Sequence, residues 1–315
     1  MKIVLFITTL LTFASSFATP NNVFNPGFSS FKVTVQGVDN YYEVLAISAM
    51  PKETLHIKSS TDTSISVVSG SLKKKTNNRW EWTAPTKSGL YPVVISPSTG
   101  KSMTLNVFVL RPASDIKKGK LDGYHIGPYP SKPFKNLAAY HTPRGYLEVT
   151  RANKHTLVSP HFTLEQFLCK LPAVNGKKFI VLTTTLILKL ERILQAVNNG
   201  GYNAKSLYIM SGYRTPFYNR SIGSKRHSRH IYGDAADIYI DVAPEDGVID
   251  DLNKDGKINR KDAAVLYDLI ELLSQQEGWG MGGLGEYEAT STHGPFVHVD
   301  SRGYRARWGK PSATY

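Results

Sequence analysis

The sequence predicts an α+β protein in which an all-β segment precedes a segment of mixed helices and strands. Three observations support this fold class. Residues 28–112 contain short runs in which apolar and polar side chains alternate, as in half-buried strands. Residues 182–198 carry apolar side chains at helical spacing, and strand-like runs follow at 207–210, 238–240 and 296–300. With 315 residues, 41% of them apolar, the chain is long enough for two domains.

The first residues have the pattern of a secretory signal peptide. Lys2 precedes an apolar run over residues 3–11, and Ser16-Phe17-Ala18 supplies small residues for cleavage. We therefore predict a signal peptide at 1–18 and export to the periplasm or the cell wall. A membrane anchor is the alternative, but the run is shorter than the roughly 20 residues of a membrane helix. We expect no membrane span after cleavage.

The charge of the chain favours an anionic partner. Lys and Arg number 38 against 25 Asp and Glu, a formal net charge of +13. For an exported protein, the peptide carboxylates of the cell wall are the expected partner. Nucleic acid is not expected, because the basic residues form no stripe interleaved with aromatic side chains.

Cys169 is the only cysteine, so no internal disulfide forms, and its apolar neighbours predict that it is buried. The sequence gives no indication of an oligomeric state.

Residues 19–112 are predicted to form a β-sandwich module. Alternating or strand-like runs occur at 31–35, 65–67, 80–82, 91–95 and 105–109. Short strands at this spacing suggest an immunoglobulin-like sandwich, although the cysteine pair of antibody domains is absent. We assign no chemistry to this module. A connector rich in Pro, Gly and Tyr is predicted at 113–158.

The second domain is predicted at 159–315. Thr163 and Gln166 have the spacing of a capping box at the start of a short helix. The longer helix at 182–198 ends at Gly200-Gly201. A strand at 207–210 then leads directly into Ser211-Gly-Tyr-Arg214.

Two segments of this domain carry the residue types of a catalytic zinc site. His230 and Asp237 lie in one segment, and His298 lies on a predicted strand at 296–300. Alternation along that strand places His298 and Asp300 on one face and two valines on the other. Two imidazoles and a carboxylate can bind zinc and leave the fourth position open. The alternative is a hydrogen-bonded core histidine without a metal.

The motifs around these residues resemble those of a known family. Residues 228–237 fit S-x-H-x-x-G-x-A-x-D, Ser211-Gly-Tyr-Arg214 stands upstream, and Phe296-Val-His298-Val-Asp300 stands downstream. Together they resemble the zinc D-Ala-D-Ala carboxypeptidase family, the LAS-type metallopeptidases that cut bacterial peptidoglycan peptides. Residues 162–167 resemble the opening of a peptidoglycan-hydrolase branch of that family. The resemblance covers roughly 159–309.

The resemblance implies a role for several residues. His230, Asp237 and His298 match the zinc ligands. Arg214 matches an arginine that holds a substrate carbonyl or carboxylate and stabilises the oxyanion. Ser228 is expected to orient the loop or to contact substrate.

The sequence does not identify the residue that acts as general base. Many members place it directly before the last histidine, where this chain has Pro295 and Phe296. The candidates are His293 and Asp300, with Glu286 third. Asp300 is equally well interpreted as a partner that orients a ligand histidine.

A second cation site is predicted between the two halves of the zinc site. Residues 251–262 have the twelve-residue calcium pattern, with Gly256 at position 6. The predicted calcium ligands are Asp251, Asn253, Asp255, the carbonyl of Lys257, Asn259 and Asp262. A structural calcium ion is expected to hold this insert against the catalytic half. The alternative is a surface turn rich in Asp and Asn.

These observations predict an exported zinc metallopeptidase that hydrolyses amide bonds in peptidoglycan stem or cross-link peptides. Either an endopeptidase or a carboxypeptidase is compatible with the sequence. Two other classes remain: a catalytically degenerate protein that binds the cell wall, and a calcium-dependent adhesion or scaffold protein. The last leaves the zinc motif unexplained.

Overall fold

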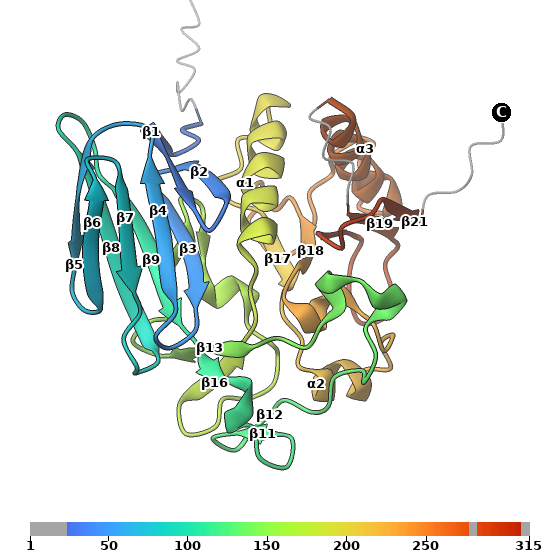
Figure 1. Ribbon diagram of the computed structural model, residues 1–315. Helices are drawn as coiled ribbons and strands as arrows, with labels where there is room; N and C mark the ends of the chain where they lie inside the picture. Colours follow the sequence, from blue (N-terminus) through green and yellow to red (C-terminus); the bar gives the residue numbers. More distant parts are fainter. Residues whose placement is uncertain (1–23, 277–281, 310–315) are drawn as a thin grey trace, which may run out of the picture.

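The computed structural model describes residues 24–276 and 282–309. It is rich in strands and has few helices, so the predicted α+β class is confirmed (Figure 1). The predicted signal peptide at 1–18 lies outside the described residues. No described helix is long and apolar enough to cross a membrane.

Nine strands in the first part of the chain form two sheets. The first sheet has the order β2-β1-β4-β7-β6 and the second β3-β9-β8-β5; all neighbours are antiparallel except β3 and β9. Apolar side chains of both sheets belong to one core. The immunoglobulin-like assignment stays a prediction. The strands are β1 (Phe28–Val35), β2 (Val38–Tyr42), β3 (Val44–Ala49), β4 (Thr54–Ser59), β5 (Thr63–Val67), β6 (Ser71–Thr76), β7 (Arg79–Thr83), β8 (Gly89–Pro97) and β9 (Met103–Val109).

The predicted connector is ordered and built from short elements. Its longest strand pairs with one neighbour on each side to give a three-stranded sheet, β10-β13-β16. The strands of the connector and of the residues on either side of it, from 111 to 180, are β10 (Arg111–Pro112), β11 (Lys120–Leu121), β12 (Tyr124–His125), β13 (Gly145–Thr150), β14 (Leu157–Ser159), β15 (Phe162–Thr163) and β16 (Lys177–Ile180). The 3-10 helices are η1 (Ala113–Asp115), η2 (Phe134–Asn136), η3 (Ala138–Tyr140) and η4 (Leu164–Phe167).

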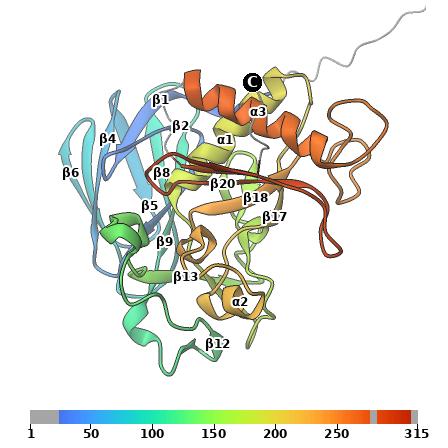
Figure 2. The same ribbon diagram turned by 90° about the vertical axis from the view of Figure 1, so that its right-hand side faces the viewer.

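A five-stranded sheet in the second part carries the predicted zinc ligands. Its order is β17-β18-β20-β19-β21. Helix α3 packs against β19 and β20, and α1 packs against α3 (Figure 2). The elements are α1 (Thr184–Asn199), β17 (Tyr208–Ser211), α2 (Pro216–Ser221), η5 (Arg229–Tyr232), β18 (Ala235–Tyr239), α3 (Arg260–Gln276), β19 (Gly283–Tyr287), β20 (Phe296–Asp300) and β21 (Ala306–Trp308).

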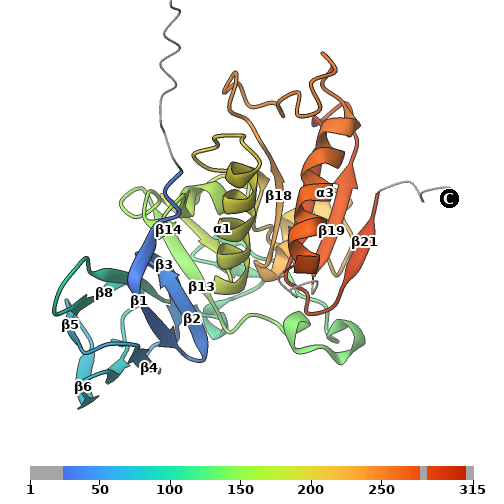
Figure 3. The same ribbon diagram turned by 90° about the horizontal axis from the view of Figure 1, so that it is seen from above.

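Helix α1 joins the two parts of the molecule. Viewed from above, it lies between the N-terminal sheets and α3 (Figure 3). The hydroxyl of Thr184 donates to the carbonyl of Ala46 on β3 at 3.2 Å, and the Asn106 amide on β9 donates to the carbonyl of Leu157 at 2.8 Å. A single cluster of buried apolar residues runs through both parts. The predicted boundary at residue 112 stays a prediction.

Local chemistry sets the helix starts near 160–190. The capping box of Thr163 and Gln166 is confirmed, and it opens the 3-10 helix η4. Helix α1 begins two residues later than predicted, because the Thr183 side chain accepts a hydrogen bond from the amide of Leu186 and so acts as the N-cap. Cys169 is buried, as expected, in the loop after η4.

Candidate metal centre

His230, Asp237 and His298 come together from three adjoining elements. His230 lies in η5, and Asp237 and His298 face each other on the paired strands β18 and β20. Gly233 makes the turn between η5 and β18 with a φ of +71°, and a Cβ there would lie 2.2 Å from the carbonyl oxygen of Val181. Glycine is therefore required at this turn. The turn brings His230 back over the strand that carries Asp237.

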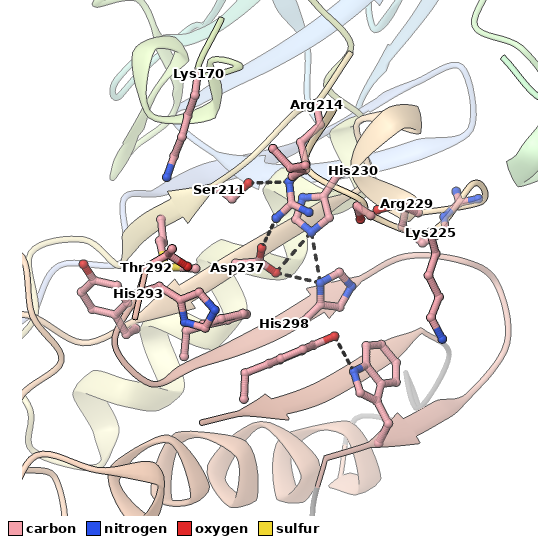
Figure 4. A pocket seen from close by; sticks show the side chains of 18 of the residues that line it. Lys170, Ser211, Arg214, Lys225, Arg229, His230, Asp237, Thr292, His293 and His298 are labelled. Atoms are coloured by element: carbon pink, nitrogen blue, oxygen red, sulfur yellow. Dashed lines mark hydrogen bonds and ion pairs between the residues drawn. The ribbon is translucent and has the colours of Figure 1, made fainter. Parts of the chain in front are cut away.

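Three ligand atoms converge at the centre of this group (Figure 4). Nε2 of His230 lies 3.2 Å from both Oδ1 of Asp237 and Nδ1 of His298, and the last two atoms are 2.8 Å apart. All three side chains are buried. Among the described residues, they are the only group of three His, Cys, Asp or Glu side chains with ligand atoms this close.

The other ring nitrogens show that lone pairs point into this triangle. Nδ1 of His230 lies 2.7 Å from the carbonyl oxygen of Gly212 and must donate to it. Nε2 of His298 lies 3.0 Å from Asp300 Oδ2 and donates to that carboxylate. The remaining nitrogens therefore face Asp237 Oδ1 as acceptors. Acceptors this close need a cation or an added proton between them.

A metal ion fits this arrangement better than a proton. Ligands at about 2.0–2.2 Å from a tetrahedral zinc ion are separated by roughly 3.3 Å, near the distances observed. Burial lowers the pKa of His230 and keeps it neutral, as a ligand must be. Burial also lowers the pKa of His298, but hydrogen bonds to Asp237 and Asp300 outweigh it and raise this pKa to about 9. One added proton on His298 satisfies two contacts at most, whereas an ion meets all three atoms.

Asp300 lies behind His298 and outside the cleft. Its carboxylate accepts from Nε2 of His298, from the amide of Gly283 at 2.7 Å and from Arg302. Burial raises the pKa of Asp300, but His298 and Arg302 outweigh burial and hold it well below its usual range. A fully buried carboxylate with these donors has no path to a substrate. The geometry favours the orienting role over that of general base.

Arg214 and Ser228 both line the cleft that opens over the centre. Arg214 donates through Nε to the hydroxyl of Ser211 at 2.8 Å and pairs through Nη2 with Asp237 Oδ2. It therefore fixes the second oxygen of the carboxylate whose first oxygen faces the histidines. Ser228 is the residue before η5, and its carbonyl accepts from the amide of Ile231 at 3.3 Å.

His293 also lines the cleft, and Glu286 does not. Nδ1 of His293 lies 2.9 Å from the carbonyl oxygen of Gly294 and donates to it, which leaves Nε2 to exchange a proton. Glu286 is buried and paired with Arg260. Of the three candidates for the base, His293 alone combines a free ring nitrogen with access to the cleft.

The family comparison supports this centre. Residues 160–254 match the family model of Peptidase M15. Peptidases of this family depend on zinc, so the match supports a metallopeptidase, and the His-Asp-His group supplies the ligands that such an enzyme needs. The matched segment contains Arg214, His230 and Asp237, and His298 lies beyond its end. No curated protein matches the chain.

The predicted calcium loop begins near the end of the M15 match. Its side chains bond to the loop backbone: Asp251 accepts from the amides of Asp255 and Gly256, and Asp262 from those of Leu252 and Asn259. Asp251, Asp255 and Asp262 do not form a close group of ligand atoms like that at the zinc centre. These bonds explain the Asp and Asn side chains as turn formers and helix caps. Calcium binding stays a prediction.

Several residues that hold or surround the centre were assigned no role from the sequence. The Gly212 carbonyl and the Ser211 hydroxyl hold His230 and Arg214, although only Arg214 of that motif was given a role. Tyr287 lines the cleft and accepts a hydrogen bond from Nε1 of Trp308 at 2.9 Å, and the Trp308 ring lies 5.2 Å from that of His298. The M15 match ends before these two aromatic residues.

Proposed function

We propose that this protein is an exported zinc metallopeptidase that hydrolyses amide bonds in peptidoglycan stem or cross-link peptides. The observation that carries the proposal is the triangle of ligand atoms from His230, Asp237 and His298, buried at the floor of a cleft of about 1530 Å³. A cleft of this volume is large enough for a peptide. The match to Peptidase M15 supports the same reaction class.

Metal binding, charge stabilisation and proton transfer are assigned to different residues. His230, Asp237 and His298 would hold a zinc ion, which would supply Lewis-acid chemistry to a substrate carbonyl and a water molecule. Arg214 keeps Asp237 in place and presents its guanidinium to the cleft, where it stabilises negative charge on the substrate. His293 accepts a proton at Nε2 and returns it to the leaving amine.

Product analysis of digested cell wall tests this proposal. Purified peptidoglycan is incubated with the protein, with the protein after chelation, and with a His230→Ala variant, and soluble fragments are identified by mass spectrometry. We expect new peptide fragments from the untreated protein alone, and their masses identify the bond. Unchanged wall in all three samples, with zinc bound to the wild type, points instead to a catalytically degenerate wall-binding protein.

We further propose that the loop at 251–262 binds a structural calcium ion. The support is the spacing of its oxygen donors and a left-handed Gly256 with a φ of +78° at position 6. Isothermal titration with calcium chloride should show one site in the wild type and none in Asp251→Ala. Absence of heat at millimolar calcium in the wild type leaves the loop as a turn held by its own backbone.

A further inference from the structure

The cleft over the metal centre is lined by positive charge. Asp237 is the only acidic residue among the described residues that line it, and it belongs to the centre itself. The same lining includes six basic side chains: Lys170, Arg214, Lys225, Arg226, Arg229 and Arg302. A substrate in this cleft therefore meets a cationic wall.

Three of these cations are already neutralised by aspartates. Arg214 pairs with Asp237, Arg229 with Asp234, and Arg302 with Asp300. These pairs stabilise the centre, and each aspartate offsets part of the positive charge of its arginine.

The other three cations are available to a ligand. Lys170, Lys225 and Arg226 are exposed, and no ion pair to them is found among residues 24–276 and 282–309. Because no described residue pairs with them, these three side chains can form ion pairs with a ligand that enters the cleft.

The two groups of free cations stand on opposite sides of the metal centre. Lys170 follows η4, whereas Lys225 and Arg226 lie in the loop between α2 and η5. In Figure 4, the amino groups of Lys170 and Lys225 lie at opposite ends of the view, with His230, Asp237 and His298 between them. A peptide bound across the centre would therefore have a cation on each side of the bond that is cleaved.

We propose that the substrate is a peptide that carries a free carboxylate on each side of the cleaved amide bond. One carboxylate pairs with Lys170, and the other pairs with Lys225 and Arg226. A cross-link between two acidic stem peptides has this charge pattern. The inference rests on the proposed peptidase function and assigns the residues that bind the carboxylates of its substrate.

The test uses four synthetic versions of one cross-linked peptide. Both carboxylates are free in the first, one or the other is amidated in the second and third, and both are amidated in the fourth. Each is assayed with the wild type, with Lys170→Gln, and with a Lys225→Gln/Arg226→Gln double variant. The matched control is Lys205→Gln, which removes an exposed lysine of the same domain that does not line the cleft.

We expect each amidation to lower kcat/KM of the wild type by about threefold to fivefold, the range of an exposed ion pair. Lys170→Gln should remove sensitivity to one amidation, and the double variant should remove sensitivity to the other. Added salt should slow cleavage of the free peptide and leave the fully amidated peptide unaffected. Lys205→Gln should behave as the wild type.

A binding assay separates this inference from the proposed function. Isothermal titration of the zinc-free protein with the free and fully amidated peptides should show weaker binding of the amidated peptide and of the two cleft variants. Equal binding and equal cleavage of all four peptides overturn the inference and leave the peptidase function intact. Charge-dependent binding without any cleavage by the zinc-loaded wild type overturns the peptidase function instead.

Discussion

At the scale of single residues, the first two of the three candidates for the general base, His293 and Asp300, occupy different places. Asp300 lies behind His298, where its carboxylate fixes the ring through a 3.0 Å bond. We expect Asp300→Asn to weaken zinc binding about 10-fold to 100-fold, because partners of ligand histidines orient them and raise their basicity. Competition with a chromophoric chelator measures this affinity. Unchanged affinity together with a large fall in kcat would instead make Asp300 the base.

His293 lies in the cleft, and its replacement should affect proton transfer alone. We expect His293→Gln to keep full zinc content and to lower kcat about 10²-fold to 10⁴-fold, the usual contribution of a general acid or base. The measurement is kcat for a defined peptide beside zinc content by atomic absorption. A variant that retains the kcat of the wild type assigns proton transfer to another group.

The sequence predicted the three side chains that converge at the centre but not all of the groups that hold them in place. His298 and Asp300 were placed on one face of a strand because alternation is a local property of the chain, and Val297 and Val299 are buried on the other. The Gly212 carbonyl that holds His230 comes from 18 residues away, and local periodicity does not encode such a contact. The contact between Trp308 and His298 was not predicted for the same reason, because it joins residues from two different strands.

At the scale of elements, the turn between η5 and β18 decides whether the centre forms. Gly233 has a left-handed φ, which is unfavourable for alanine, and a Cβ added there would clash with the carbonyl of Val181. We therefore expect Gly233→Ala to lower the free energy of unfolding by about 3 kcal/mol. Gly176→Ala is the matched control, since Gly176 has a φ of +72° and no atom within 4 Å of a Cβ. Its expected cost is about 1 kcal/mol. Urea denaturation measures both, and equal losses would show that the close contact relaxes freely.

Helix α1 supports β20 through a half-buried lysine. The Lys189 amino group donates to the backbone carbonyl of Asp300 at 2.6 Å, and burial lowers the pKa of Lys189 to about 8. Because the unfolded chain holds this proton up to about pH 10.4, stability gains from this group as pH rises from about 8 to 10.4. The gain is at most about 3 kcal/mol, since one pKa unit corresponds to about 1.4 kcal/mol.

The variant Lys189→Met isolates that contribution. Urea denaturation of both proteins between pH 7.5 and 9.5 should show the wild type gaining stability relative to the variant as pH rises, because the other titrating groups cancel in the difference. A constant difference across this range would mean that Lys189 keeps its ordinary pKa in the folded protein.

At the scale of the whole molecule, the N-terminal sheets and the second part of the chain pack against each other and share one core. The sequence predicted an N-terminal module and a catalytic domain, because composition and periodicity change near residue 112. It did not predict that β14 and α1 pack against β3, since this packing joins residues more than a hundred positions apart. Gly27 also lies against Pro160, and His161 contacts the carbonyl oxygen of Asn25 at 3.0 Å. The N-terminal sheets therefore cover apolar surface of the catalytic part.

This packing predicts that residues 113–315 do not fold alone. Removal of the sheets exposes side chains of α1 and β14 that are buried in the shared core, and it leaves the Leu157 carbonyl without the amide of Asn106. We expect the truncated chain to be insoluble or to lose its cooperative thermal transition, whereas the full chain unfolds in one transition that zinc shifts to higher temperature. Differential scanning calorimetry and zinc titration of both proteins make the comparison. A soluble 113–315 chain that binds zinc with the affinity of the full protein would show that the sheets are an independent module, joined to the catalytic part without supporting it.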